Sequence, residues 1–142
     1  MQPRCLELTT TPPVTETCGG LTATIVGPPG NEGILDTPGP DGIDGLGGAD
    51  TIPGLGGNDV LCGGTGNDTM LSGPDNDQAL GEGGNDLVRG GGADQGKGAA
   101  GADQLFGGAA NDQLTGGTGT DRCNDGRGAD TATTCERKMS MP

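Results

Sequence analysis

A nine-residue repeat limits what this chain can fold into more than any other feature. Four consecutive blocks that begin at Gly54 read GLGGNDVLC, GGTGNDTML, SGPDNDQAL and GEGGNDLVR, with Asp in the sixth place of each. Steps of nine from these blocks meet an acid in the sixth place from Glu32 to Asp130, with one step of eight between Asp86 and Asp94. Because a chance match does not keep phase over so many steps, the segment is a true repeat, the signature of stacked structural units.

The composition excludes an ordinary globular core. Of 142 residues, 33 are glycine, one is Phe, and none is Tyr, Trp or His. Twenty acids against 7 bases give a net charge of -13, so the bare chain repels itself and resembles a disordered acidic segment. Nucleic acid and anionic membrane surfaces are therefore not expected as partners, whereas cations are. No apolar run is long enough for a membrane span, and no signal-peptide pattern follows Met1.

The repeat predicts an all-β fold, a right-handed parallel β-roll (a β-solenoid) with eighteen residues in each coil. Six residues rich in Gly, Asn and Asp form a turn, because glycine supplies the positive φ values that such turns need. The other three, x-U-x, form a short strand in which the apolar residue U points inward. Two nonapeptides close one coil, and coils stack at about 4.8 Å. We expect the roll over residues 18–133, starting with a coil at Cys18, an extended N-terminal arm over 1–17, and a C-terminal cap and tail over 134–142.

The inward residues divide into two columns, one for each sheet. The first column is predicted to be Ile25, Ile43, Leu61, Ala79, Gly96, Leu114 and Ala132, and the second Ile34, Ile52, Met70, Val88, Leu105 and Cys123. The small residues Ala79 and Gly96 lie on adjacent coils, next to the shortened turn at 90–94. We therefore expect the roll to be loosest or irregular there.

Five cysteines in a small acidic chain favour disulfides and an oxidising, extracellular setting. The preferred pair is Cys123 with Cys135, although Cys123 alone would also serve as a small buried apolar residue. Cys18 with Cys62 is the second pair, and Cys5 with Cys18 is its rival. The odd count leaves one cysteine unpaired in a monomer, and Cys5 is the candidate.

The acids in the sixth place are the candidate metal ligands. Calcium takes six to eight oxygens at about 2.3 to 2.6 Å, and a glycine-rich turn can direct several backbone carbonyls toward one point beside a carboxylate. Zinc prefers nitrogen and sulfur from His and Cys, so calcium is the better match. Turns on the same side recur every eighteen residues, so an ion would lie between the turns of adjacent coils. One edge carries Asp41, Asp59, Asp77, Asp94, Asp112 and Asp130, and the other carries Glu32, Asp50, Asp68, Asp86, Asp103 and Asp121.

Several turns depart from the pattern and predict weaker sites. The departures are Asp75 in place of glycine in turn 72–77, alanines in turns 98–103 and 107–112, and no first glycine in turn 36–41. Glu32 is one methylene longer than Asp, and the short turn at Asp94 is expected to be the weakest. We expect about half to two thirds of the inter-turn sites to hold calcium.

These nonapeptides resemble the repeats-in-toxin (RTX) family of secreted bacterial calcium-binding proteins. The resemblance covers roughly residues 18–133 and is most specific at GLGGND (54–59), GGTGND (63–68), GEGGND (81–86) and GGTGTD (116–121). It implies a calcium-loaded parallel β-roll that is disordered without calcium and often assists the secretion and folding of an attached passenger. It also implies that the sixth-place acids and the turn carbonyls are ligands.

The sequence therefore predicts a secreted calcium-binding repeat protein in which Ca2+ held between successive turns drives folding. An enzyme is not expected, because a chain without His has only Asp and Glu for acid-base chemistry. The alternative that stays open is an extracellular structural or adhesion module, such as a surface layer, a filament or a ligand-binding roll, that uses calcium only for rigidity. Leu71, Leu80 and Phe106 follow U positions, so they should face outward, toward a partner or the N-terminal arm.

Overall fold

The chain folds into two facing parallel sheets that are joined by turns at both edges. The computed structural model describes residues 17–140. The seven-stranded sheet contains, in spatial order, β14 (Thr131–Thr133), β12 (Gln113–Thr118), β10 (Gln95–Ala100), β8 (Gln78–Gly83), β6 (Val60–Thr65), β4 (Gly42–Asp44) and β3 (Ile25–Val26). The six-stranded sheet contains β15 (Arg137–Ser140), β13 (Arg122–Gly126), β11 (Gln104–Phe106), β9 (Leu87–Arg89), β7 (Thr69–Leu71) and β5 (Thr51–Pro53). A separate hairpin contains β1 (Thr17–Cys18) and β2 (Leu21–Thr22).

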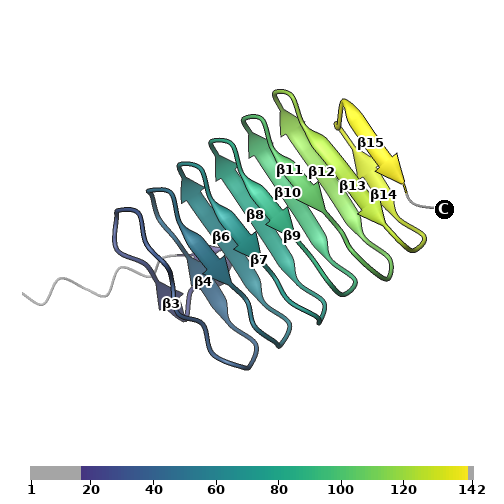
Figure 1. The fold of residues 1–142 in the computed structure, drawn as a ribbon. Helices are drawn as coiled ribbons and strands as arrows, with labels where there is room; N and C mark the ends of the chain where they lie inside the picture. Colours follow the sequence, from purple (N-terminus) through teal and green to yellow (C-terminus); the bar gives the residue numbers. More distant parts are fainter. Residues whose placement is uncertain (1–16, 141–142) are drawn as a thin grey trace, which may run out of the picture.

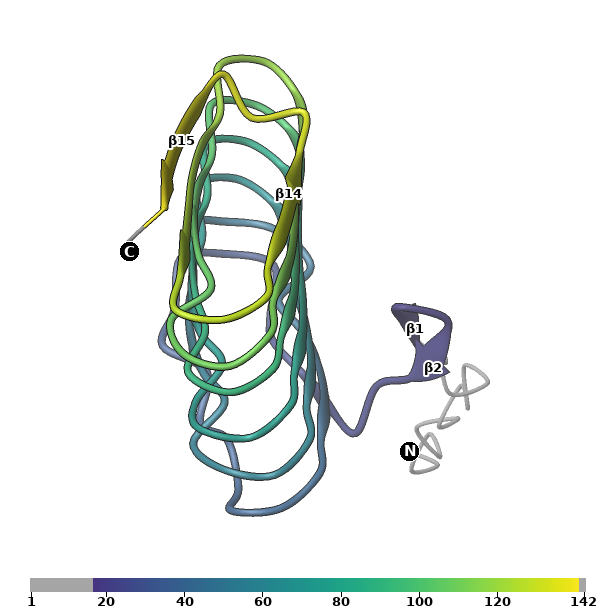
Figure 2. The same ribbon diagram turned by 90° about the vertical axis from the view of Figure 1, so that its right-hand side faces the viewer.

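From β4 onward, successive strands alternate between the two sheets, so that one strand from each sheet and two turns make one coil (Figure 1, Figure 2). Leu61 pairs with Ala79 in the seven-stranded sheet, and Met70 pairs with Val88 in the six-stranded sheet, each pair eighteen residues apart. The predicted all-β parallel solenoid with an eighteen-residue coil is therefore confirmed. Among residues 17–140 there is no helix that could cross a membrane.

A single apolar core lies between the sheets, and it consists of the predicted inward columns. The seven-stranded sheet aligns Ile25, Ile43, Leu61, Ala79, Gly96, Leu114 and Ala132, and the six-stranded sheet aligns Ile52, Met70, Val88, Leu105 and Cys123, with Ile34 beside them. The large members except Ile25, which is partly buried, are buried, and each of these stabilises the roll by about 1.5–3 kcal/mol.

The shortened turn does not disturb the sheets, so the expected irregularity is wrong for the strands. β10 pairs without a break with both β8 and β12, and only the step to the preceding coil falls from 18 to 17 residues. On the core side of Gly96, Leu114 and Val88 lie against the space that a side chain there would fill. The missing residue is absorbed in the turn itself, where Gly92 lies against the backbone of Asp75.

Close stacking of the turns explains the glycine in the fourth place of most repeats. At Gly66 the φ angle is 131°, and a Cβ atom there would lie 1.7 Å from the carbonyl oxygen of Gly48 in the preceding coil. At Gly84 the corresponding distance to the oxygen of Gly66 is 1.6 Å. A side chain at this place would force adjacent coils apart, so the stacking itself selects glycine.

The N-terminal end departs from the predicted starter coil. β1 and β2 form an antiparallel hairpin that lies beside the outer face of the seven-stranded sheet, and the roll begins only at β3 (Figure 2). The Cys18–Cys62 disulfide, with a Cα–Cα distance of 5.6 Å, ties the hairpin to β6. This confirms the second predicted pair and excludes its rival with Cys5, a residue that lies outside the described part of the chain, as does most of the predicted N-terminal arm.

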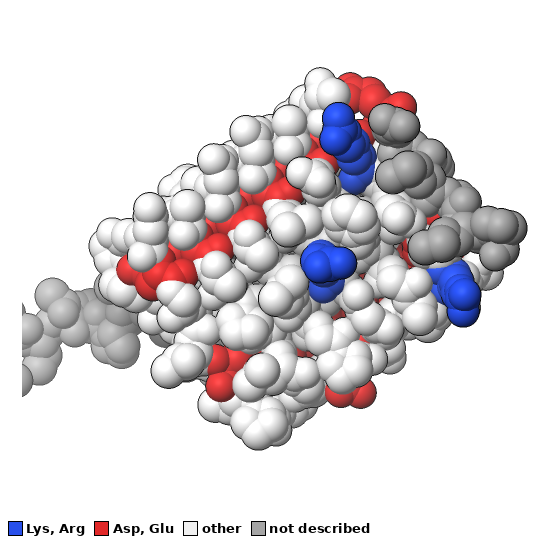
Figure 3. Space-filling model, viewed as in Figure 1, with Lys and Arg blue, Asp and Glu red and all other residues white. Residues whose placement is uncertain are grey.

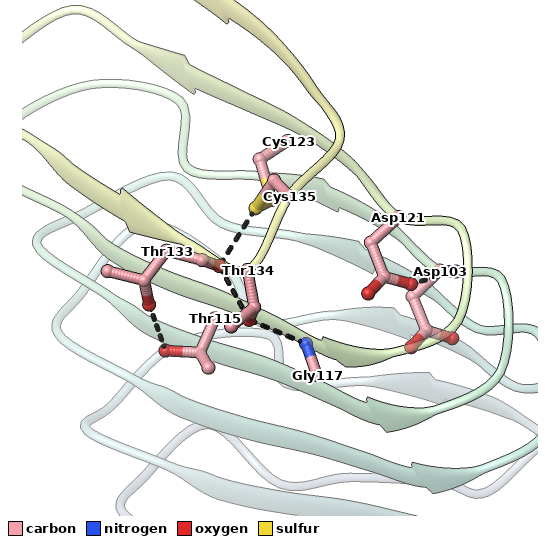
Figure 4. Close-up of a disulfide and its surroundings, with 8 residues drawn as sticks. All are labelled: Asp103, Thr115, Gly117, Asp121, Cys123, Thr133, Thr134 and Cys135. Carbon is pink, nitrogen blue, oxygen red and sulfur yellow. Dashed lines mark hydrogen bonds between the residues drawn. A yellow bond between two sulfur atoms is a disulfide. The ribbon is translucent and has the colours of Figure 1, made fainter.

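The C-terminal end is closed by the other predicted disulfide. Cys123 of the inward column is bonded to Cys135, with a Cα–Cα distance of 5.9 Å (Figure 4). Beside it, the backbone N–H of Gly117 donates to the hydroxyl of Thr134 at 2.8 Å, which holds the last turn against the coil before it. β15 then adds one more strand to the six-stranded sheet, so part of the segment predicted as a cap continues the roll.

Candidate metal centre

The sixth-place acids form two rows, one along each edge of the roll. The first edge contains the turns that lead from the seven-stranded to the six-stranded sheet, with Glu32, Asp50, Asp68, Asp86, Asp103 and Asp121. The second edge contains the returning turns, with Asp41, Asp59, Asp77, Asp94, Asp112 and Asp130. All are buried, with exposed fractions of 0–4%, except Glu32, Asp41 and Asp130 at the ends, which are partly buried. Figure 3 shows acidic side chains in a narrow row across successive coils.

One carboxylate oxygen of each buried acid binds the backbone of the preceding coil. The N–H of Asp50 donates to Oδ1 of Asp68 at 2.8 Å, and the N–H of Asp68 donates to Oδ1 of Asp86 at 2.9 Å. The same bond joins every successive pair along both edges, at 2.8–3.0 Å. Because a buried N–H needs a partner, this ladder fixes each carboxylate and holds adjacent turns together.

A second ladder, which we did not predict, runs in the opposite direction from the fifth place. Oδ1 of Asn67 accepts a hydrogen bond from the N–H of Asn85 in the following coil, and Oδ1 of Asn85 accepts one from Ala102, both at 2.8 Å. Equivalent bonds are accepted by Asn31, Asn58, Asn76 and Asn111. The recurrent Asn-Asp pair in the sequence is the signal that could have revealed it. Asp thus binds the coil before it and Asn the coil after it.

The second carboxylate oxygen of most of these acids is buried without a hydrogen-bond partner. Such oxygens belong to Glu32, Asp50, Asp68, Asp86, Asp103 and Asp121 on the first edge and to Asp59, Asp77 and Asp112 on the second. Leaving a buried acceptor unsatisfied costs about 1–3 kcal/mol, and more for a charged group. These oxygens therefore need either a cation or a proton.

Seven of these nine oxygens, all but those of Glu32 and Asp77, face a cradle that the first-place glycine of the turn leaves open. At Gly98, a Cβ atom would lie 2.2 Å from Oδ2 of Asp103 and 2.6 Å from the carbonyl oxygen of Gly116 in the following coil. A carboxylate oxygen and a carbonyl oxygen thus converge on one small space. An all-oxygen donor set at such spacing suits a hard cation such as calcium.

The cradles are completed by backbone rather than by further side chains. Within residues 17–140 no three Asp, Glu, His or Cys side chains come together as a metal-binding group. In five turns the free oxygen of the acid faces a carbonyl oxygen of the next coil, as at Gly45, where a Cβ atom would lie 2.9 Å from Oδ2 of Asp50 and 2.5 Å from the oxygen of Gly63. Carbonyl oxygens are ordinary calcium ligands, so the residues present fit the ion.

Two acids of the second edge are arranged differently. Asp94, after the shortened turn, has its Oδ2 bound by the backbone N–H of Gly91 at 2.8 Å. Asp41 accepts hydrogen bonds from the hydroxyls of Thr37 and Thr24, and these bonds lower the pKa of its carboxyl. Neither acid has a free oxygen, so the second edge offers fewer cradles than the first.

Burial raises the pKa of the stacked carboxyls. The pKa is about 6 for Asp77, Asp86 and Asp112, because burial disfavours the charged form and neighbouring carboxylates add to the effect, against an opposing backbone hydrogen bond. Burial also raises the pKa of Asp59, Asp68, Asp94 and Asp103. Residues 17–88 contain no Lys or Arg that could supply a counter-charge. A bound divalent cation would favour the ionised carboxylates instead.

Stacked parallel coils with a carboxylate and a carbonyl oxygen converging at each turn define a metal-binding β-solenoid. The chain matches the family of RTX calcium-binding nonapeptide repeats in four copies, at residues 36–70, 71–95, 90–123 and 97–132. It therefore belongs to that family, as predicted, and its coils form a calcium-binding roll. No curated protein and no solved structure matches the chain.

Proposed function

We propose that calcium ions bound at the cradles are the condition on which this roll folds, and that the protein is a secreted, calcium-dependent folding unit. The observation that carries the proposal is the row of buried carboxylate oxygens without partners, of which those of Asp50, Asp59, Asp86, Asp103 and Asp121 each converge with a carbonyl oxygen of the following coil. The proposed ligands are the nine acids that have such an oxygen. Of the other three predicted ligands, Asp41 and Asp94 serve the turns structurally, and Asp130 is partly exposed at the end of its row.

The free energy of calcium binding is comparable in size to the stability of a small folded domain. Sites with dissociation constants of 10⁻⁴ to 10⁻³ M, as in extracellular modules, correspond to about 4 to 5.5 kcal/mol each at the 1 M standard state. A small domain is stable by only about 5–15 kcal/mol in total. Several ions therefore decide whether the self-repelling chain is folded, and folding and binding become one event.

Two disulfides support a location outside reducing compartments, because thiols stay reduced in the cytosol. We therefore place the protein in the extracellular space. No catalytic role is proposed, since the sequence has no His and the buried acids already face carbonyl oxygens as a ligand array would.

Circular dichroism tests the proposal directly. In excess calcium the chain should give a β spectrum, and excess chelator should convert it into the spectrum of an unfolded chain, reversibly when calcium is restored. The disulfides stay oxidised throughout, so that only the metal changes. Equal β signals with and without calcium at neutral pH would refute calcium-dependent folding.

A partner-binding module is the second candidate, and one face of the roll favours it. On the outer face of the six-stranded sheet, the guanidinium of Arg89 lies 5.7 Å from the ring centre of Phe106. Both residues line a groove of about 320 Å³ together with Asn124, whose Oδ1 is buried without a partner. Leu80, in contrast, lies under the N-terminal hairpin, near its turn at Gly19. Binding of the calcium-loaded protein to carboxylated oligosaccharides, lost in Arg89→Ala, would support this candidate, and no binding would exclude that ligand class.

A further inference from the structure

Positive charge is concentrated in one half of the roll. Residues 89–140 contain six Lys and Arg and seven acids, whereas residues 17–88 contain eleven acids and no Lys or Arg. In the view of Figure 3, the basic side chains lie toward the C-terminal end of the roll. Because the nonapeptide pattern specifies acids and no bases, the fold itself does not require this asymmetry.

Most of these bases belong to the outer face of the six-stranded sheet or to its edge. Arg89 in β9 and Arg122 in β13 are exposed, on strands that lie about 10 Å apart. Arg137 in β15 is the register partner of Arg122, and the exposed Arg127 follows β13 in the next turn. In the six described strands of this sheet the one acid is Asp125, which is 9% exposed. The strands themselves therefore offer little negative charge to offset the bases.

The neighbouring sixth-place acids decide whether this half is electropositive. Asp121 directly precedes Arg122, and Asp103 lines the same hollow of about 260 Å³ as Arg122. Both acids have an oxygen without a partner and a cradle completed by a carbonyl oxygen of the following coil. While both are ionised without a cation, their charges offset those of the nearby bases. Divalent ions at these two cradles alone would change the formal charge of residues 89–140 from −1 to +3, because each ion adds two positive charges.

The basic face suits an anionic polysaccharide better than a nucleic acid or a membrane. Single-stranded nucleic acid binds by stacking its bases on aromatic rings, and Phe106 is the one aromatic residue of the chain, with Arg89 already over its ring at 5.7 Å. A membrane surface needs several apolar side chains to insert, and in the described strands of this sheet Leu71 is the one large hydrophobic residue that is exposed. An anionic polysaccharide needs only spaced charges, which Arg89 and Arg122 provide.

The dependence on calcium selects among anionic groups. Carboxylate oxygens are preferred calcium ligands, so a carboxylated chain would compete with the cradles for the ions that make the face electropositive. A sulfate ester is a weaker calcium ligand and stays charged at neutral pH. Its oxygens accept paired hydrogen bonds from a guanidinium, as those of a phosphate do. A sulfated polysaccharide is therefore the better match.

We propose that calcium loading makes the C-terminal half of the six-stranded face electropositive, and that a sulfated polysaccharide then binds across β9, β11 and β13. The inference rests on the proposed function, because it requires calcium at the cradles. It goes beyond the groove at Arg89, because the binding surface extends over three coils and is switched on by the ions. Without calcium the sixth-place acids repel an anionic chain, and with calcium this repulsion is removed.

Three polymers with the same backbone test this surface, namely dextran sulfate, carboxymethyl dextran and dextran. With the calcium-loaded protein, isothermal titration calorimetry should show the tightest binding for dextran sulfate and none for dextran, and binding should weaken as sodium chloride is raised. Arg89→Ala and Arg122→Ala should each weaken binding to dextran sulfate about threefold, and the double variant about tenfold. Circular dichroism in calcium verifies that each variant is folded.

Lys97→Ala is the matched control. It removes the same charge from an exposed position on the opposite sheet, so it should change the affinity for dextran sulfate by less than about 1.5-fold. If Lys97→Ala weakens binding as much as the two Arg variants do, the attraction is one of overall charge and the surface is not a specific site.

The failures of this inference and of the proposed function are distinguishable. If the protein folds with calcium but does not bind dextran sulfate, the inference alone fails. Tighter binding of carboxymethyl dextran, of single-stranded nucleic acid or of anionic vesicles would overturn the assigned partner. If chelator changes neither the β spectrum nor the binding, calcium-dependent folding and the calcium switch fail together.

Discussion

Replacing Asp68 by Asn should weaken the roll by an amount that grows with the calcium concentration. The Asn side chain keeps an oxygen that can accept the N–H of Asp50, a bond of 2.8 Å, but it removes the charge from the oxygen that has no partner. Loss of one site costs about 2.7 kcal/mol when calcium is a hundred times its dissociation constant and about 4.1 kcal/mol at a thousand times. The penalty should therefore rise by about 1.4 kcal/mol for each tenfold increase in calcium.

Asp94→Asn is the control, because Asp94 is also a buried sixth-place acid but has no free oxygen. Oδ2 of Asp94 accepts the N–H of Gly91, so the substitution should cost about 0.5–1.5 kcal/mol for that hydrogen bond, at every calcium concentration. Urea unfolding followed by circular dichroism, over the range of calcium in which all three proteins fold, measures both penalties. A constant penalty for Asp68→Asn, or a rising one for Asp94→Asn, would refute the assignment of the free oxygens as ligands.

Three further outcomes are expected. Gly66→Ala should destabilise the roll by about 3 kcal/mol or more, because its Cβ would overlap a carbonyl of the preceding coil, whereas Gly33→Ala, with nothing within 4 Å of the added atom, should change the free energy of unfolding by less than about 0.5 kcal/mol. In chelator, stability should increase on acidification: carboxyls such as Asp86, whose folded pKa is about 6 against an ordinary 3.8, contribute stability that is fully present below the ordinary value and is lost as the pH rises through 6. A β signal in chelator that does not increase as the pH drops from 6 to 4 would contradict this. Replacing both Cys123 and Cys135 by Ala should lower the free energy of unfolding in calcium by about 3 kcal/mol, and an unchanged urea midpoint would show that this loop constrains nothing.

Strict periodicity made most of the fold predictable from the sequence. Once the acids and the inward residues occupy fixed places of a nonapeptide, a parallel stack allows one register, because a slip of one residue would turn every core side chain outward. The pairing of Leu61 with Ala79 and of Met70 with Val88 follows from that rule alone. The two rows of acids follow from it as well.

The features that escaped prediction depend on residues outside the repeat. Whether a carboxylate has a free oxygen is decided at Asp41 by two threonine hydroxyls and at Asp94 by the backbone of its shortened turn, and neither contact recurs along the chain. The N-terminal hairpin turns at Gly19 and Gly20, both with positive φ, and this local turn prevails over the weak nonapeptide phase. The space at Gly96 is filled by neighbours whose reach no single-column pattern reveals.

The eight-residue step before Asp94 has a consequence for how such chains diverge. A residue is missing from one rim, yet every strand beyond it keeps its partner, because Gln95 pairs with Gln78 and with Gln113 alike. An insertion or deletion of a single residue at a rim is thus a local event that leaves the pairing of the neighbouring strands unchanged. An array built in this manner can gain or lose length in its bends while its interior stays unchanged.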